Sequence, residues 1–132
     1  NGLDALEIIL RSLGIGSGDQ VVTTPMTAVA TVLAILRSGA TPVLADIDPT
    51  TGLLDPESVQ RCVTEQTSAV ILVHIYGQVR NMAAWVSLCD SLGIALIEDC
   101  AQSHGAKEAG DSCGSFGVAS CWRPSRSDGR RQ

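Results

Sequence analysis

Helix-like and strand-like stretches alternate along the chain. Apolar side chains at helical spacing, or helix-start signals, predict helices at residues 4–13, 27–36, 55–63 and 82–92. Short apolar runs between them predict strands at residues 20–24, 42–47, 68–75 and 94–97, and a further strand is expected within 114–122. This alternation predicts right-handed crossovers and a parallel sheet. The expected fold class is therefore α/β, a three-layer α/β/α domain with a mostly parallel sheet.

The strand at 94–97 leads into the stretch with the most candidate chemistry. Two carboxylates, Glu98 and Asp99, follow it directly, and Gln102 and His104 come shortly afterwards. Ligands of open α/β sheets bind outside the carboxyl ends of the strands. Asp99 is therefore placed to hold a cationic ring nitrogen, and Gln102 to reach a neighbouring oxygen. The alternative is that Asp99 only caps a turn and that His104 is an ordinary loop residue.

Asn1, Gly2 and Leu3 form the predicted start of the first helix. The free backbone amides and the positive end of the helix dipole at such a start can hold a phosphate group. Asparagine is also a preferred helix cap, so a plain cap without a ligand is the alternative.

The net charge of −5 argues against a nucleic-acid groove. The charge is uneven, because residues 1–122 carry 5 basic and 13 acidic side chains, whereas residues 123–132 carry four arginines and one aspartate. This last segment lacks apolar periodicity and is expected to be an atypical, disordered tail. No apolar run has the length of a membrane span. Five scattered cysteines without a C-x-x-C pair predict reduced thiols in a cytoplasmic protein.

Four other side chains are interpreted as structural. His74 lies in an apolar strand and is expected to be a hydrogen-bonded core histidine, and Cys100 is expected to be a small buried residue. Tyr76 and Trp85 are expected to be packing residues, with Tyr76 near the ligand cleft.

Eight segments of the chain form an ordered set with consistent spacing. They are N-G-L-D-A-L at 1–6, G-I-G-S-G-D-Q-V at 14–21, T-P-M-T-A-V-A-T at 24–31, G-A-T-P-V at 39–43, D-I-D-P-T-T at 46–51, V-H-I-Y-G-Q at 73–78, I-E-D-C-A-Q-S-H-G-A at 97–106 and G-S-F-G at 114–117. Together they resemble the DegT/StrS sugar aminotransferases, which are pyridoxal-phosphate (PLP) enzymes of fold type I. The resemblance implies that residues 1–122 are part of the large, PLP-binding domain of such an enzyme. It implies transfer of an amino group, usually from glutamate, to a nucleotide-linked keto-sugar.

The resemblance also implies roles for individual residues. Asp99 resembles the acid that pairs with the pyridine nitrogen of PLP and keeps it protonated, so that the ring can act as an electron sink. Gln102 matches the residue that contacts the 3-hydroxyl of the ring. The backbone of three residues matches the helix start that holds the cofactor phosphate, namely Gly2, Leu3 and Asp4.

The chain departs from the family at several positions. Leu3 stands where many relatives have threonine, and Ala28 stands where relatives often carry an aromatic ring that stacks on the cofactor. Relatives follow the strand at 118–122 with a segment that carries the Schiff-base lysine, whereas this chain continues with R-P-S-R at 123–126. The only lysine, Lys107, matches a variable surface position, and the guanidinium of Arg126 is a poor nucleophile. The chain is therefore expected to be a fragment that lacks the catalytic lysine and is inactive alone.

The resemblance further implies PLP as the cofactor, a homodimer for the full-length protein, and a cytoplasmic role in nucleotide-sugar and polysaccharide biosynthesis. One alternative is a small flavodoxin-like module that binds a phosphate or a protein without covalent chemistry. A second alternative is a metal site formed by Asp99, Cys100 and His104, with His74, although their spacing matches no common zinc pattern.

Overall fold

A five-stranded sheet forms the centre of the molecule. The computed structural model describes residues 1–122, so the segment predicted to be a disordered tail lies outside the described residues. The strands run in the order β2-β1-β3-β4-β7, and every pair of neighbours is parallel. Their bounds are Gln20–Thr23 (β1), Thr41–Leu44 (β2), Thr67–Val73 (β3), Ala95–Asp99 (β4) and Ala119–Cys121 (β7). The predicted parallel sheet is confirmed.

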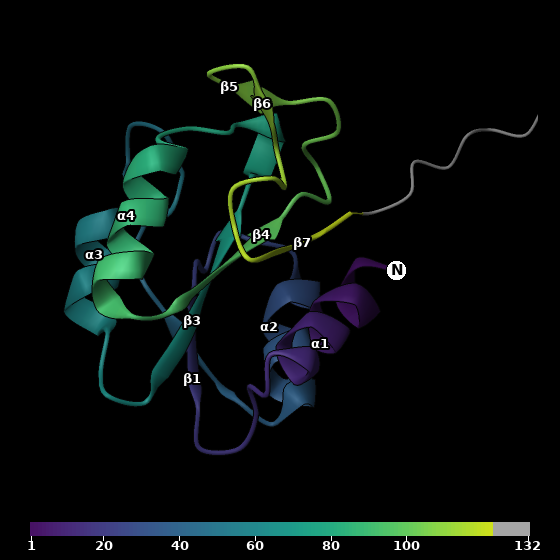
Figure 1. Cartoon of the computed structure of the whole chain (residues 1–132), viewed down its shortest axis with the longest axis vertical. Coiled ribbons are helices and arrows are strands. Elements are labelled where there is room, and N and C mark those ends of the chain that lie inside the picture. The colour runs from purple at the N-terminus through teal and green to yellow at the C-terminus, as the bar shows by residue number, and fades with distance from the viewer. Residues whose placement is uncertain (123–132) are drawn as a thin grey trace, which may run out of the picture.

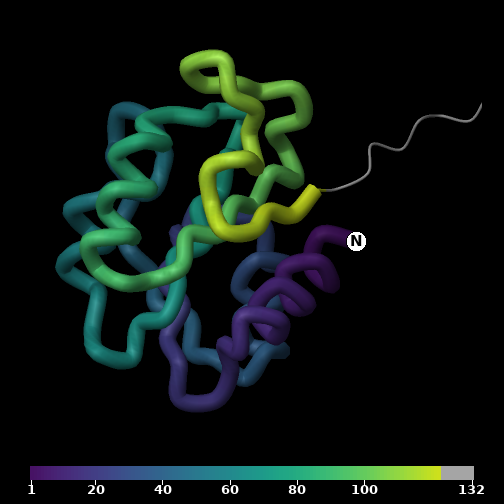
Figure 2. The backbone as a smooth tube through the Cα atoms, in the orientation of Figure 1, coloured from purple at the N-terminus to yellow at the C-terminus, as the bar shows by residue number. Residues whose placement is uncertain are grey.

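Helices cover both faces of this sheet (Figure 1). The helices α1 (Gly2–Ser12) and α2 (Val29–Ser38) pack against each other on one face, and α3 (Pro56–Cys62) and α4 (Met82–Leu92) lie on the other. This is the predicted three-layer α/β/α arrangement. Figure 2 shows β7 running beside α1, so the two ends of the described chain lie close together. None of the helices described within residues 1–122 is long and apolar enough to cross a membrane.

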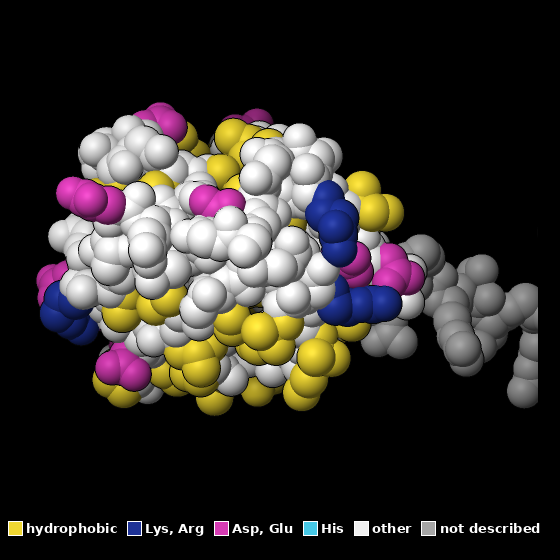
Figure 3. Space-filling view, turned by 90° about the horizontal axis from the view of Figure 1, so that it is seen from below, with side chains coloured by type: hydrophobic (Ala, Val, Ile, Leu, Met, Phe, Trp, Pro, Cys, Tyr) yellow, Lys and Arg dark blue, Asp and Glu magenta, His cyan; other side chains and the backbone are white. Residues whose placement is uncertain are grey.

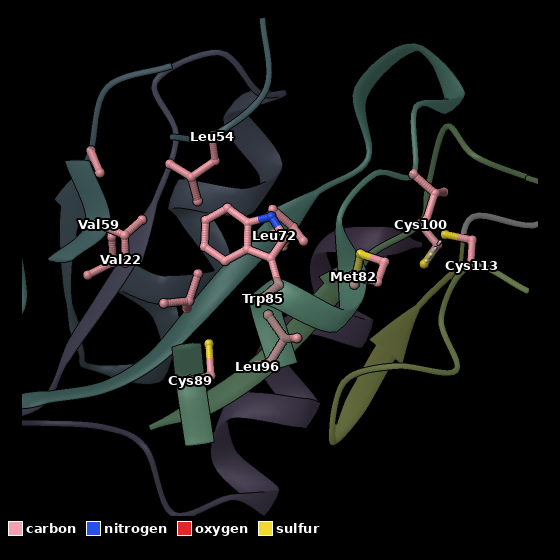
Figure 4. Packing of buried hydrophobic residues seen from close by; sticks show 13 residues of the cluster. Val22, Leu54, Val59, Leu72, Met82, Trp85, Cys89, Leu96, Cys100 and Cys113 are labelled. Carbon is pink, nitrogen blue, oxygen red and sulfur yellow. Dashed lines mark hydrogen bonds between the residues drawn. The ribbon is translucent and has the colours of Figure 1, made fainter. Parts of the chain in front are cut away.

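Each face of the sheet buries its own apolar cluster. Successive strand residues point to opposite faces, so Val21 packs with Leu10 and Ile35 of the α1–α2 layer, whereas Val22 packs in the α3–α4 layer. Trp85 of α4 is buried in this second cluster, as expected for a packing residue (Figure 4). Because side chains on both faces of the sheet are buried, the central strands are continuous apolar runs in the sequence.

The start of α3 and the end of α4 agree with their sequence signals. Asp55 caps α3 by accepting hydrogen bonds from the amides of Glu57 at 3.2 Å and Ser58 at 2.9 Å. Gly93 ends α4 with a φ of 66°, a left-handed conformation that glycine adopts without a steric penalty.

The carboxyl end of β3 differs from the prediction. The strand ends at Val73 rather than at Ile75, because a single 3₁₀ turn at Ile75–Gly77 follows it. Tyr76 in this turn has a φ of 56°, which is uncommon for a residue with a side chain. The chain therefore turns sharply at the sheet edge where ligands of α/β proteins bind.

A small hairpin between β4 and β7 was not predicted from the sequence. It consists of β5 (Lys107–Glu108) and β6 (Asp111–Ser112), which pair in antiparallel fashion. The two turn residues, Ala109 and Gly110, have φ values of 52° and 95°, and tight hairpin turns of this kind need positive φ at both positions. Alanine is not a usual residue at such a position, so the sequence gives a weak signal for this turn.

Candidate functional site

A cleft lies along the carboxyl ends of β1, β2, β3 and β4. It contains an outer hollow of about 600 Å³ and an inner hollow of about 350 Å³, and Ala28 and Gln102 line both. The outer hollow is also lined by Pro25, Met26, Thr27, Ile47, Ile75 and Tyr76. The inner hollow is also lined by Asn1, Gly2, Leu3, Ala30, Asp99 and Ala101. The structure thus brings together most of the residues that the sequence nominated for a ligand site.

The Asp99 carboxylate lies at the inner hollow and is held by three donors. Asp99 is the last residue of β4 and is only 7% exposed. Its Oδ2 accepts a hydrogen bond from Oγ1 of Thr31 at 3.0 Å. Its Oδ1 accepts from the amide of Ala101 at 3.1 Å and from Sγ of Cys121 at 3.4 Å. The bond from Ala101 is the turn cap that the sequence offered as an alternative, and the same carboxylate also lines the hollow.

Thr31 is a site residue that the sequence interpretation missed. It is completely buried in α2, and its Oγ1 lies 2.8 Å from Oγ1 of Thr27. Thr27, Thr31 and Asp99 therefore form a short chain of hydrogen bonds from the rim of the cleft to the sheet. The i, i+4 spacing of the two threonines was the available sequence signal, since such pairs lie on one side of a helix.

Two helix N-termini converge on the inner hollow. α1 begins at Gly2 and α2 begins at Val29, and both Gly2 and Ala30 line the hollow. The first amides of a helix have no intrahelical acceptor, and the helix dipole places a partial positive charge there. The amides of Gly2 and Leu3 belong to this first turn of α1. The inner hollow is therefore suited to an anion such as a phosphate group.

Asp4 lies differently from Gly2 and Leu3. Its amide donates a hydrogen bond to Oδ1 of Asn1 at 3.0 Å, so Asn1 caps α1, which the sequence offered as the alternative to a phosphate site. Its carboxylate lies 3.5 Å from the guanidinium of Arg37 on the exposed side of the helix. Asp4 is not among the residues that line the inner hollow.

Ala28 and Tyr76 are the two positions that bear on whether an aromatic side chain lines the cleft. Ala28 is the N-cap residue of α2, and its methyl group offers no ring for stacking. Among the described residues that line the two hollows, Tyr76 is the only aromatic one, and it is 73% exposed. The prediction that Tyr76 is a packing residue is wrong, whereas its predicted place near the cleft is right.

Glu98 points away from the cleft and is completely buried. It accepts hydrogen bonds from Nε2 of His74 at 2.9 Å and from the amides of Gly114, Phe116 and Gly117 at 2.9, 2.8 and 2.7 Å. Burial alone raises the pKa of this carboxyl, but the four hydrogen bonds outweigh burial and hold the pKa below its ordinary value of 4.5. The prediction that His74 is a hydrogen-bonded core residue is confirmed.

The alternative metal site is not assembled from the residues that the sequence suggested. His104 is exposed, and its ring lies edge-on to that of Trp122 with the centroids 5.5 Å apart. A different set of four buried side chains comes together, with ligating atoms within 4.8 Å of one another, namely His74, Glu98, Cys100 and Cys113. Only His74 and Cys100 belong to both sets. Cys100 is completely buried, as predicted.

The fold defines a class of protein. The five-stranded parallel sheet with helices on both faces has the fold of one part of the fold type I aminotransferases. Residues 1–122 match the DegT/DnrJ/EryC1/StrS aminotransferase family, and the chain belongs to this family. The family resemblance inferred from the sequence motifs is confirmed.

Curated relatives are longer than this chain. It is 46% identical over 122 residues to the pleiotropic regulatory protein of Geobacillus stearothermophilus. It is 43% identical over 122 residues to the dTDP-3-amino-3,4,6-trideoxy-alpha-D-glucose transaminase of Micromonospora megalomicea subsp. nigra. Each match covers 92% of this chain and 33% of the relative, so the chain spans about a third of the length of these relatives.

A solved aminotransferase structure contains the same arrangement of helices and strands. The aminotransferase from Psychrobacter cryohalolentis matches with a TM-score of 0.89 at 41% sequence identity. The match covers 92% of this chain and 31% of that protein. The similarity extends over nearly the whole described chain and places it within one part of a larger fold.

Proposed function

We propose that this chain supplies the PLP-binding part of a sugar aminotransferase. The observation that carries the proposal is that Asp99 and the first turn of α1 line the same inner hollow. PLP has a phosphate group at one end and a basic nitrogen in its ring. The helix amides suit the phosphate, and the carboxylate suits the ring nitrogen. In support, a relative from Bacillus subtilis that is 32% identical to this chain has been solved with the bound cofactor PMP.

The residues at the sheet edge fit the ring of PLP. Asp99 would pair with the ring nitrogen and keep it protonated, and Thr31 and Ala101 hold its carboxylate in place. Gln102, which lines both hollows, would contact the 3-hydroxyl. When bound, PLP supplies an electron sink for a carbanion at the substrate. Ala28 would leave the face of the ring without an aromatic partner.

The start of α1 fits the phosphate. The amides of Gly2 and Leu3 would donate to it, and the positive end of the α1 dipole would favour its charge. The amide of Asp4 already donates to Asn1, so Asp4 would contribute only after the Asn1 side chain turns away.

The proposed reaction of the complete enzyme is transfer of an amino group, usually from glutamate, to a nucleotide-linked keto-sugar. The relative named as a dTDP-amino-sugar transaminase supports a substrate of this class. Residues 1–122 would be part of the PLP-binding large domain, and the full-length protein would be a homodimer. It would act in nucleotide-sugar and polysaccharide biosynthesis in the cytoplasm.

This chain alone is proposed not to transaminate. Its only lysine, Lys107, is exposed on β5 and is not among the residues that line the cleft. Covalent attachment of PLP requires a lysine amine within reach of its aldehyde. We therefore expect PLP to bind noncovalently and to keep the absorption spectrum of the free aldehyde. Conversion of glutamate and a keto-sugar above background by the purified chain would contradict this proposal.

Equilibrium dialysis with PLP tests the binding site. A charge-assisted hydrogen bond contributes about 1.5–3 kcal/mol, so Asp99→Asn should weaken PLP binding roughly 10- to 100-fold. Asp111→Asn is the matched control, because Asp111 is exposed on β6 away from the cleft, and it should leave the affinity unchanged. Far-UV circular dichroism verifies that both variants are folded. Equal PLP affinity of the Asp99→Asn variant and the parent chain would refute the assigned site.

A further inference from the structure

We propose that Cys100 and Cys113 are a redox modification site, at which they form a reversible intramolecular disulfide. Their Sγ atoms lie 2.9 Å apart, and their side chains are 0% and 2% exposed. Figure 4 shows the two sulfur atoms next to each other at one end of the α3–α4 cluster. The two residues bracket the loop that contains β5 and β6, so the bond would close this loop at its base.

The backbone around the two thiols holds them in this position. The amide of Ser103 donates to the carbonyl of Cys100 at 3.1 Å, and the amide of Cys113 donates to the carbonyl of Ala106 at 2.9 Å. Oγ of Ser103 also lies 2.9 Å from Sγ of Cys113. A disulfide bond is about 2.05 Å long, so the sulfur atoms need to approach by only about 0.9 Å from their present 2.9 Å.

A disulfide fits these thiols better than a metal ion does. Cys100 and Cys113 belong to the group of four buried side chains that could ligate a metal. However, Glu98 already accepts hydrogen bonds from His74 and from three backbone amides. A metal ion could bind Glu98 and His74 only after some of these hydrogen bonds were broken. Within residues 1–122 no buried side-chain nitrogen or oxygen atom lacks a hydrogen-bond partner. The disulfide needs only the two thiols and leaves these hydrogen bonds in place.

The proposed oxidant is hydrogen peroxide. One cysteine attacks it as a thiolate, which breaks the O–O bond and gives a sulfenic acid and a hydroxide ion. The hydroxide takes up the proton that the thiol had lost and leaves as one molecule of water. The other thiol then attacks the sulfenic sulfur, the S–S bond forms, and a second molecule of water leaves. The two thiols thus lose two electrons to the peroxide, and a dithiol reductant reverses the change.

Burial sets the conditions under which the bond forms. Burial raises the pKa of both thiols, so little thiolate is present at neutral pH and the closed loop reacts slowly. The intervening loop is largely exposed, with Gln102, His104 and Lys107 all open to solvent, and its opening gives the peroxide access. The pair therefore stays reduced under ordinary cytosolic conditions and cross-links under oxidative load.

The disulfide would restrain one wall of the cleft. Ala101 and Gln102 lie directly after Cys100, and both line the inner hollow. An effect of oxidation on PLP binding would rest on the proposed function, whereas the cross-link itself depends only on the two thiols. Failure of PLP binding would therefore leave the cross-link prediction unaffected.

Peptide mapping after peroxide treatment tests the proposal. Trypsin cleaves after Lys107, which places Cys100 in the peptide 81–107 and Cys113 in the peptide 108–126. After native oxidation, alkylation and digestion, these two peptides should be joined, and dithiothreitol should separate them. Cys100→Ser and Cys113→Ser should each abolish the cross-link. Cys89→Ser and Cys121→Ser are the matched controls on the same two peptides and should retain it.

Three outcomes would overturn the proposal. The first is a cross-link that persists in the Cys113→Ser variant. The second is its absence from the folded parent chain at a peroxide dose that oxidises Cys89, which is as deeply buried as the pair. The third is that Zn²⁺ alone protects Cys100 and Cys113 from alkylation. This result would assign the pair to a metal site. Hydrogen exchange of the parent chain gives a test that needs no variant. The backbone amides of residues 101–112 should exchange with solvent more slowly after oxidation than before it.

Discussion

Glu98 is a buried carboxylate whose charge is stabilised by hydrogen bonds instead of water. Burial raises its pKa, but His74 and three backbone amides outweigh burial, so its pKa in the folded chain is below 4.5. Because this pKa is lower than in the unfolded chain, Glu98 contributes stability at pH values above about 4.5. That contribution is lost as the pH falls through the lower, folded-state pKa. Acidification should therefore loosen the contact between β4 and the loop before β7.

The substitution Glu98→Gln should make the stability less dependent on acid pH. The amide of glutamine brings its own donor close to the backbone amides, so the free energy of unfolding at neutral pH should fall by about 1–3 kcal/mol. As the pH falls below about 4.5, the stability of the variant should change less steeply than that of the parent. Urea unfolding followed by tryptophan fluorescence measures both effects. Glu57→Gln, at an exposed position of α3, is the control, and equal slopes for Glu98→Gln and the parent would contradict the assignment.

Single residues were predictable where their sequence neighbours carry the information. The burial of His74 followed from the apolar strand around it, and the cap of α1 followed from Asn1 itself. Thr31 was missed because its partner Asp99 lies 68 positions away and no local pattern links them. The amides that bind Glu98 were missed for the same reason. The PLP-binding roles of Asp99 and Gln102 came from the family resemblance, and they remain predictions.

At the scale of elements, α4 begins with an unusual cap. Its N-cap residue, Asn81, has a φ of 57° and makes no capping bond with its own side chain within the described chain. Glu108 of β5 accepts hydrogen bonds from the amides of Asn81 and Met82 at 2.5 and 2.6 Å. A carboxylate also complements the positive end of the helix dipole. The hairpin therefore stabilises a helix that is distant from it in the sequence.

Removal of this cap should destabilise the chain measurably. Glu108→Ala leaves two helix amides without their acceptor, and the loss of a helix cap costs about 1 kcal/mol. The midpoint of urea unfolding should shift accordingly, while Asp111→Ala on the neighbouring strand should leave it unchanged. Equal midpoints for the two variants would show that Glu108 does not cap α4 in solution.

The helices and main strands were predictable because their apolar periodicity extends over many residues. The hairpin was not, because β5 and β6 have two residues each and their turn places Ala109 at positive φ. The end of β3 was placed two residues late, since Ile75 continues the apolar run although its backbone has already turned. Elements stabilised by tertiary contacts instead of by their own sequence pattern are the ones that the sequence left unresolved.

At the scale of the whole molecule, α2 is apolar on two sides. Ala34 and Ile35 are buried against the sheet, whereas Val29, Leu33 and Leu36 are 71%, 41% and 53% exposed. These three residues recur at i, i+4 and i+7, so they lie along one side of the helix. Figure 3 shows hydrophobic side chains gathered on part of the surface seen from below. An exposed apolar stripe of this kind marks an interaction surface, and a second copy of the chain in the proposed homodimer would cover it.

Sedimentation velocity over a range of concentrations tests this association. The parent chain should sediment as a larger species as the concentration rises, because association removes the exposed stripe of α2 from water. The double variant Leu33→Lys, Leu36→Lys should shift to the monomer, since it places two charges on the stripe and leaves the buried side of α2 intact. Leu44→Lys on the edge strand β2 is the matched control, as Leu44 is 52% exposed, and it separates helix packing from edge-to-edge strand pairing. Loss of association in the Leu44→Lys variant but not in the double variant would assign the contact to the sheet edge and contradict a dimer through α2.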